Sequence, residues 1–281
     1  MPFFELFDET LDINAVDNYE LSVQVSIHGL SFCILDSIRN KYILIRSFVP
    51  DEKKYFNSAM VADIIKKDDF LARKFKKTRV VIPGSKATLV PAPLYDSNRK
   101  DDYFSLNYPK EDNEVILSNK IADPDSYLLF TSQVSINDLI KDSFPGVIPV
   151  HHIKPLLSHI SGERKKISGH YIHVHIEQDF FNLIIFDHNS LILCNSFMYT
   201  NIADILYYVL NVFKKLVIKN DETVHFSGIT GKYEDLFSSF LVYTRNISFA
   251  VPSGNFTFSY VFNDVDLHRY INLLTLVNCE L

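Results

Sequence analysis

The chain contains 281 residues, of which 47% are hydrophobic and 22% charged, and its formal net charge is −6. This composition is typical of a folded globular protein, excludes a largely disordered one, and allows two domains with separate cores. The acidic balance argues against nucleic-acid binding, which needs a basic face. The sequence contains no run of about 18 apolar residues, so we expect no membrane-spanning helix.

The cysteines and the N-terminal residues indicate a cellular compartment. Cys33, Cys194 and Cys279 are odd in number, far apart, and each lies among apolar residues. Such cysteines are typical of buried free thiols in a reducing compartment. Residues 1–19 are acidic and lack the basic and apolar regions of a secretory signal. We therefore expect a cytoplasmic protein.

The first half begins with a predicted three-stranded meander. After an N-terminal arm over residues 1–18, apolar and polar residues alternate over 21–28, 31–37 and 42–48, which predicts antiparallel strands. Apolar residues at helical spacing then predict an amphipathic helix over 55–75. The other predicted elements of this half are strands at 79–83, 114–121, 127–134 and 147–152, an edge strand or extended segment at 87–94, a loop at 96–113, and helices at 135–144 and 154–160.

The second half repeats this order. The polar residues 161–168 are predicted to join the halves, so we expect domains at 1–162 and 163–281. Each half then consists of three strands followed by alternating helices and strands, with extra strands inserted in the first half. The predicted elements of the second half are strands at 170–177, 180–187, 191–198, 223–226 and 247–251, and helices at 202–218, 233–242 and 264–276.

Two stretches of the chain align without a gap. With a constant offset of 149 residues, the apolar positions of residues 21–48 coincide with those of residues 170–197. The alternative is a chance similarity between two meanders. The same offset continues into the next predicted helix, where Ile64 meets Phe213. We therefore interpret the chain as an internal duplication.

This order of elements resembles known folds. Three antiparallel strands followed by alternating helices and strands resemble the ribonuclease-H-like fold, and two tandem copies resemble the actin-like ATPase superfamily of sugar kinases, heat-shock chaperones and pilus or secretion scaffolds. The chain is also similar, over nearly its whole length, to a bacterial family of unknown function described as having an actin-like ATPase fold. This resemblance implies an α/β protein with mixed sheets and two ribonuclease-H-like lobes. The stretches that carry it are Leu89–Tyr95, Phe104–Asn107 and His268–Leu274.

The resemblance directs attention to the turn between the first two strands of each half. Active members hold phosphates there with an aspartate, glycines and a Ser or Thr, because glycines let backbone N–H groups approach the phosphate and the carboxylate positions Mg²⁺. The first turn here keeps Gly29 and Ser31 but has no carboxylate. The second turn, residues 177–181, has acids but no glycine. Both turns are therefore predicted to be degenerate.

A third signature of the superfamily is a strand that ends in a small residue and a glycine and binds adenosine. Residues 224–232 have this layout, with Ser227, Gly228, Gly231 and Lys232 as candidate nucleotide contacts. The alternative is a glycine turn that strand-to-helix geometry alone requires. A Gly-x-x-Gly-Lys without an earlier glycine and a following Ser or Thr is not a Walker loop.

Histidines supply one other candidate site. His173, His175 and Glu177 share one face of a predicted strand and could hold the metal ion of a hydrolase. Hydrogen-bonded core histidines are the alternative. No Gly-x-Ser-x-Gly elbow is present, and the acids do not form the converging set of a ribonuclease H. We expect no catalytic and no metal-binding residues.

The sequence thus predicts a non-catalytic actin-like protein, a pseudo-ATPase that serves as a cytoplasmic binding or scaffold module. We expect a protein partner, no nucleic acid and no cofactor, and an exposed apolar patch on one lobe. The alternative is an ATP-binding protein or kinase-like enzyme that uses ATP and Mg²⁺ in the cleft between the lobes. Gly29, Ser31 and residues 227–232 would then contact the nucleotide.

Overall fold

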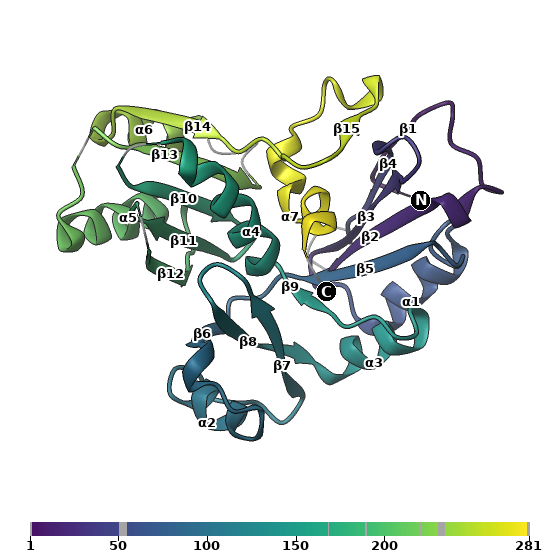
Figure 1. Cartoon of the computed structure of the whole chain (residues 1–281), viewed down its shortest axis with the longest axis horizontal. Helices are drawn as coiled ribbons and strands as arrows, with labels where there is room; N and C mark the ends of the chain where they lie inside the picture. The colour runs from purple at the N-terminus through teal and green to yellow at the C-terminus, as the bar shows by residue number, and fades with distance from the viewer. Residues whose placement is uncertain are drawn as a thin grey trace.

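The computed structural model describes residues 2–50, 55–167, 169–188, 190–219, 221–229 and 234–279. It contains two large mixed sheets and a third, smaller antiparallel sheet (Figure 1). In Figure 1 the sheet of the first half lies on the right, that of the second half on the left, and the small sheet below them. The α/β class with mixed sheets expected from the sequence is confirmed.

The first large sheet contains the strand order β4-β3-β2-β5-β9. Strands β2, β3 and β4 form the expected antiparallel meander because their apolar residues alternate, and β5 and β9 extend the sheet in parallel from β2. The N-terminal arm supplies β1, which pairs antiparallel with the outer edge of β4. The strands are β1 (Phe4–Phe7), β2 (Tyr19–Ser26), β3 (Gly29–Asp36), β4 (Lys41–Phe48), β5 (Lys77–Ile82) and β9 (Val150–His151).

The second large sheet has the corresponding order, β12-β11-β10-β13-β14. Its first three strands are again antiparallel, and β13 and β14 follow in parallel. The two sheets therefore share one topology, that of the ribonuclease-H-like fold. The strands are β10 (Tyr171–Ile176), β11 (Phe180–Phe186), β12 (Leu191–Met198), β13 (Thr223–Gly228) and β14 (Asn246–Phe249).

The ladders of the two meanders differ in register. Val23 lies opposite Phe32 in the first sheet. The constant offset would place Ile172 opposite Phe181, but Ile172 lies opposite Ile185. The ungapped offset of 149 therefore does not hold across the first turn. The two large sheets still share one strand order, and the internal duplication stays a prediction.

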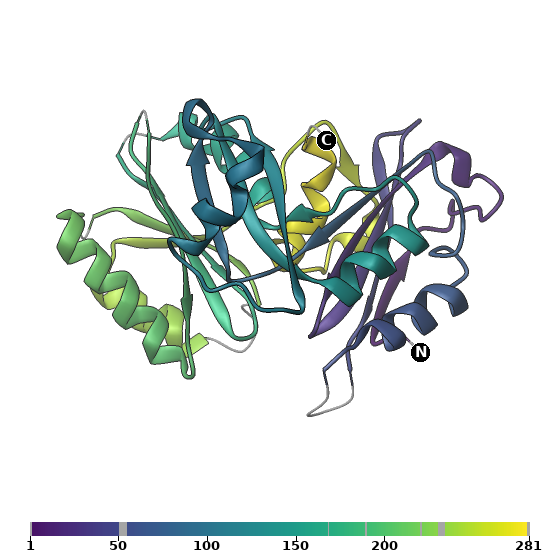
Figure 2. The ribbon, with the colours of Figure 1, turned by 90° about the horizontal axis from the view of Figure 1, so that it is seen from below.

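Amphipathic helices cover one face of each large sheet. Val61 of α1 and Ile140 of α3 pack in the core of the first sheet, and Val209 of α5 and Phe240 of α6 pack in the core of the second. Figure 2 shows α1 and α3 together beside the first sheet, with α5 at the opposite end of the molecule. The helices are α1 (Ser58–Lys67), α3 (Val134–Ser143), α5 (Ile202–Leu216) and α6 (Glu234–Tyr243).

The small sheet interrupts the first half between β5 and α3. Its order is β6-β8-β7, with both pairs antiparallel, and α2 packs beside it. The loop expected over residues 96–113 was wrong in part, because α2 lies within it; this helix is too short and too charged to show apolar periodicity. The elements are β6 (Ala87–Pro91), α2 (Lys100–Ser105), β7 (Glu114–Ile121) and β8 (Ser126–Gln133).

Two predicted helices are shorter than expected. The helix expected over 55–75 ends at Lys67, because the Asp68 carboxylate accepts hydrogen bonds from the N–H groups of Phe70 and Leu71 and forms a turn. The helix expected over 264–276 is a series of 3₁₀ turns around α7 (Ile271–Leu274). This last segment winds between two buried surfaces, so its apolar residues do not follow one helical face.

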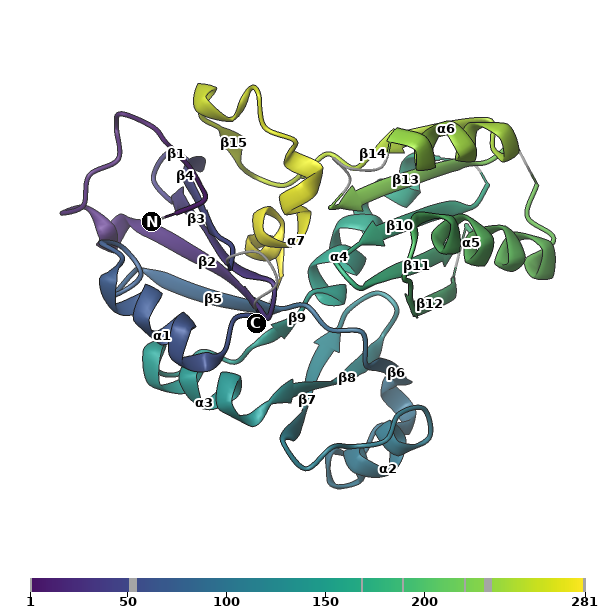
Figure 3. The same cartoon turned by 180° about the vertical axis from the view of Figure 1, so that it is seen from behind.

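The chain crosses between the large sheets at two places. Helix α4 (Ile153–Glu163) packs in a core with Tyr171, Ile184 and Phe186 of the second sheet. The C-terminal segment returns to the first sheet, where β15 (Thr257–Phe258) pairs with β4 and the Tyr42 hydroxyl donates to the Leu274 carbonyl at 2.7 Å. Figure 3 shows α7 between the two sheets. Each lobe is thus completed by a segment from the other side, and the domain boundary at residue 162 stays a prediction.

Among the helices of the described ranges, none is long and apolar enough to cross a membrane.

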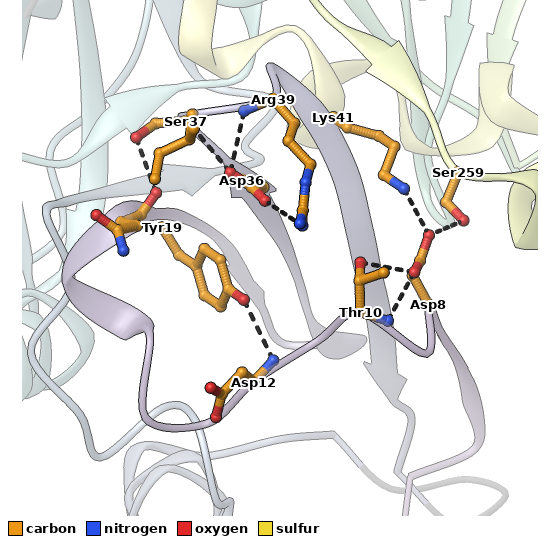
Figure 4. A network of polar contacts seen from close by, with 11 residues as sticks. Asp8, Thr10, Asp12, Tyr19, Asp36, Ser37, Arg39, Lys41 and Ser259 are labelled. Carbon is orange, nitrogen blue, oxygen red and sulfur yellow. Dashed lines mark hydrogen bonds and ion pairs between the residues drawn. The ribbon is translucent and has the colours of Figure 1, made fainter.

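A buried carboxylate ties the N-terminal arm to the C-terminal segment. Asp8, only 2% exposed, accepts hydrogen bonds from the Thr10 amide and hydroxyl, from Lys41 Nζ at 2.9 Å and from Ser259 Oγ at 2.5 Å (Figure 4). Burial alone would raise the pKa of Asp8, but these hydrogen bonds outweigh it and lower the pKa well below its usual range.

We expect Asp8→Asn to destabilise the protein by about 2–4 kcal/mol at pH 7, because the substitution removes the charge that pairs with Lys41 in a buried site. A carboxylate with a lowered folded-state pKa contributes stability above its unfolded pKa, and this contribution is lost as the pH falls toward the folded value. The difference between wild type and Asp8→Asn in urea unfolding should therefore shrink below about pH 4.

The control for this prediction is Asp102→Asn, which removes an exposed partner of Arg99. Exposed ion pairs contribute little, so this variant should unfold within about 0.5 kcal/mol of wild type. Equal stabilities of Asp8→Asn and Asp102→Asn would show that Asp8 does not fasten the two ends.

Candidate functional site

The two turns that would hold phosphates face each other. The first joins β2 to β3 at Ser26–Gly29, and the second joins β10 to β11 at residues 177–180. His28 Nε2 of the first turn lies 2.7 Å from Asp179 Oδ2 of the second, and the Tyr55 ring contacts the His28 imidazole edge-on. Side chains of the two turns therefore bridge the space between the lobes.

The candidate residues of the first turn have roles within the sheet. Gly29 is the first residue of β3 after the two-residue turn Ile27-His28, and a Cβ atom added to it would lie 2.7 Å from the Phe48 carbonyl oxygen. Glycine is thus required here by the approach of β4. The Ser31 hydroxyl lies 2.9 Å from the Ser47 hydroxyl on the neighbouring strand.

The candidate residues at the end of β13 are also engaged. Ser227 is fully buried, and its hydroxyl lies 2.7 Å from both His173 Nε2 and His175 Nδ1. Gly228 has φ +85°, and a Cβ atom on it would lie 2.0 Å from the Ile176 carbonyl oxygen of β10. The close approach of β10 therefore requires glycine here, and a role of Gly228 in nucleotide binding stays a prediction. Gly231 and Lys232 lie outside the described residues.

Behind the two turns lies a buried polar network. His152, at the start of α4, bonds through Nε2 to Asn182 Oδ1 of β11 at 2.7 Å. His175 Nε2 lies 3.1 Å from Glu177 Oε1 and 3.0 Å from Asn272 Nδ2 of α7. The network joins residues 30 to 97 positions apart in the chain. The sequence marked His175 and Glu177, as candidate metal ligands or as hydrogen-bonded core residues, but nothing in it marked Asn182 or Asn272.

Burial sets the charge of this network. Burial, with a smaller contribution from the neighbouring His175, lowers the pKa of His152 to about 4, and burial with neighbouring histidines holds the pKa of His173 well below its usual range. Burial alone would raise the pKa of Glu177, but the hydrogen bond and charge of His175 lower it. At neutral pH, His152 and His173 are therefore neutral and Glu177 is ionised.

The carboxylates near the ends of the second strands act in turns. Asp36 accepts hydrogen bonds from the backbone N–H groups of Ile38 and Arg39 and pairs with the Arg39 guanidinium (Figure 4). Asp187 accepts from the Ser190 N–H at 2.6 Å. Within the described ranges, no group of three His, Cys, Asp or Glu side chains is arranged to hold a metal ion. His173 and His175 instead share the Ser227 hydroxyl.

The second lobe carries a cluster of exposed apolar residues. Val242 at the end of α6 is 76% exposed and Val251 after β14 is 68% exposed. Helix α6 and strand β14 contact each other, so these exposed side chains lie on neighbouring elements, Leu241–Tyr243 before β14 and Val251 after it. We call this cluster the α6–β14 patch; it contains Leu241, Val242, Tyr243, Phe249 and Val251.

Comparisons with known proteins agree with the fold. A family model described as "Protein of unknown function (DUF3822)" matches residues 8–247. A Bacteroides thetaiotaomicron protein of unknown function with an actin-like ATPase fold superposes with a TM-score of 0.79 at 20% identity, covering 96% of this chain and 100% of that one. The PilM–PilN type IV pilus biogenesis complex matches with a TM-score of 0.59 at 11% identity, covering 93% and 99%. No curated protein matches.

We expect Gly228→Ala to destabilise the protein by about 3–5 kcal/mol, because the new Cβ atom overlaps the Ile176 carbonyl and the residue is held at positive φ. Gly162→Ala in α4 is the control, since its Cβ atom would meet nothing within 4 Å. That variant should be neutral or more stable. Urea unfolding measures both, and equal stability of the two variants would contradict the close approach of β13 to β10.

We also expect the protein to lose stability in mild acid. The folded state holds His152 neutral down to about pH 4, whereas the unfolded chain protonates it below about 6.5, so protons favour unfolding between these values. The loss for His152 alone is about 2 kcal/mol between pH 7 and pH 5. His152→Gln should show a flatter pH profile in thermal unfolding than wild type, whereas the control His188→Gln, at an exposed position, should not.

Proposed function

Because the chain belongs to the DUF3822 family of proteins of unknown function, and because it has the actin-like ATPase fold, we propose that it is a non-catalytic member of this fold that binds a partner protein. The bridge between His28 and Asp179 carries the proposal. In an ATPase of this fold, the two turns would face the phosphates of the nucleotide. Here their side chains face each other.

The residues that the sequence offered as nucleotide contacts have other partners, and this supports the proposal. Ser31 bonds within the first sheet, Ser227 bonds to two histidines, and Gly228 lies against the backbone of β10. A triphosphate between the turns would also approach the carboxylates of Glu177 and Asp179, and the negative charges of phosphate and carboxylate repel each other. Binding would need the His28–Asp179 pair to open and at least one carboxylate to be neutralised.

Two observations support a protein partner. The α6–β14 patch exposes five large apolar side chains over eleven residues, and exposed apolar clusters are typical of interaction surfaces. PilM, which shares the fold, is described in complex with PilN. A shared fold is an analogy, so the patch carries more of the argument than the pilus protein does.

The first test is thermal unfolding with about 5 mM ATP and Mg²⁺. A ligand present at about 100 times its dissociation constant stabilises the native state by about 2.7 kcal/mol, so binding with a constant of about 50 μM or tighter would raise the melting temperature clearly. We expect no rise. A rise that is lost on removal of Mg²⁺ would overturn the proposal and favour the nucleotide-binding alternative.

A second test asks whether the α6–β14 patch binds the partner protein. Val242→Asp places a charge at a position that is 76% exposed, so it should preserve the fold while weakening capture of a partner from cell extract. Asp102→Asn, far from the patch in the sequence and on α2, is the control. A protein retained equally by wild type and both variants would exclude the patch as its binding surface.

A further inference from the structure

The second sheet leaves one of its edge strands uncovered. Strand β12 is the first in the order β12-β11-β10-β13-β14, and among the strands of the described ranges only β11 pairs with it. The corresponding strand of the first sheet, β4, is covered on its outer side by β1 and β15. Figure 3 shows β12 at the lower border of the second sheet. The chain therefore covers this edge in one lobe and leaves it open in the other.

The burial of the two strands follows this difference. Five of the eight residues of β4 are buried, whereas none of the eight residues of β12 is buried. The two faces of β12 are nevertheless engaged, because Phe197 packs against the core under α5 and Cys194 packs against the core around α4. The exposure of β12 therefore comes mainly from its outer edge.

The backbone of this edge can pair with another strand. In an antiparallel ladder, alternate residues point their N–H and C=O groups away from the partner strand. The Tyr199 N–H donates to the Asp179 carbonyl at 3.2 Å, where the ladder of β11 and β12 begins. By alternation, Ser196 and Met198 point their backbone groups outward. An added strand would supply hydrogen-bond partners for these groups.

The sequence of β12 does not protect the edge. Soluble proteins guard exposed edges with Lys, Pro or other charged residues, which prevent pairing with another chain. Residues 191–198 contain no charged residue and no Pro. The ladder with β11 shifts register once, beside Leu193, and is regular from there to Met198. Two copies of this strand can therefore pair without placing like charges opposite each other.

Helix α5 indicates that a second copy of this chain is the partner. The helix packs on β12 through Tyr208, whose ring centroid lies 5.1 Å from that of Phe197. Asp204 in the first turn, Tyr208, and Lys215 in the last turn are spaced by four and seven residues, which places them on one side of the helix. Two such helices side by side in antiparallel orientation bring opposite charges together at both ends, and their dipoles also attract.

We propose that two copies of the chain associate through β12, antiparallel about a twofold axis, so that their second sheets join into one continuous sheet. The two α5 helices then flank the shared strands in antiparallel orientation. A strand that pairs with its own copy in this way forms the isologous contact of a closed dimer. Backbone hydrogen bonds supply affinity, and the charges at the ends of α5 favour the antiparallel orientation.

The proposal goes beyond the proposed partner binding, because it adds a contact between copies of the chain on another surface. Strand β12 and strand β14 are the two opposite edges of the second sheet, so the dimer contact and the α6–β14 patch share no residue. Failure of one proposal therefore leaves the other standing.

Sedimentation equilibrium of the full chain measures the association. We expect wild type to form dimers at a protein concentration of about 100 μM, and Asn195→Lys to raise the dissociation constant at least about tenfold. Asn195 is exposed at the middle of β12, where antiparallel pairing brings the two introduced charges near each other. Asn255→Lys, at an exposed position before β15, is the matched control and should associate as wild type does.

A mixing experiment separates a lost contact from a damaged fold. Asn195→Glu alone should be as weakly associated as Asn195→Lys, but an equimolar mixture of the two variants should form dimers again, because opposite charges then meet across the strands. Lys215→Glu should also weaken the dimer, and its effect should shrink at about 0.5 M sodium chloride, where charges are screened.

Three results would overturn the proposal. One is a wild type that remains monomeric over the whole concentration range. Another is a dimer that is equally stable in Asn195→Lys and in Asn255→Lys, because it would form through a surface other than β12. The third is an equimolar mixture of Asn195→Lys and Asn195→Glu that stays monomeric, because opposite charges at a shared edge should restore the contact.

Discussion

The structure depends on hydrogen bonds between buried polar groups where α4 and α7 meet the second large sheet. A buried donor or acceptor without a partner costs about 1–3 kcal/mol. His152, His175 and Asn272 come from three distant parts of the chain, yet each meets a polar partner there. This network fixes how α4 and α7 sit against β10 and β11. It also occupies the region just behind the two turns.

The same fold can support catalysis or lose it without changing its strands. What differs is which atoms face the space between the lobes. In this chain an imidazole and a carboxylate face each other there, at His28 and Asp179, and glycine at 228 serves the contact between two strands. Shared topology therefore carries little information about activity, and the side chains of the turns carry most of it.

The sequence predicted the strands well because their signal is local. Alternation located the meanders at β2–β4 and β10–β12 and the hairpin of β7 and β8 within two residues. It failed where structure follows from distant contacts. Helix α2 is short and charged, and the segment around α7 folds against two surfaces, so neither shows a clean period. The His28–Asp179 pair spans 151 positions, a distance at which no pattern in one sequence links two residues.

The C-terminal segment completes the first sheet, through the bond of Ser259 to Asp8 and the pairing of β15 with β4. Ser259 lies 251 positions after Asp8, and β15 pairs with β4 more than 200 residues after that strand is made. During synthesis from the N-terminus, the first meander can form early and β1 can cover most of the edge of β4, but the start of β4 at Lys41 and the apolar surface around Tyr42 stay uncovered until the C-terminal segment is made. The first lobe is thus made before the second but completed after it, and its apolar surface around Tyr42 is exposed in the meantime.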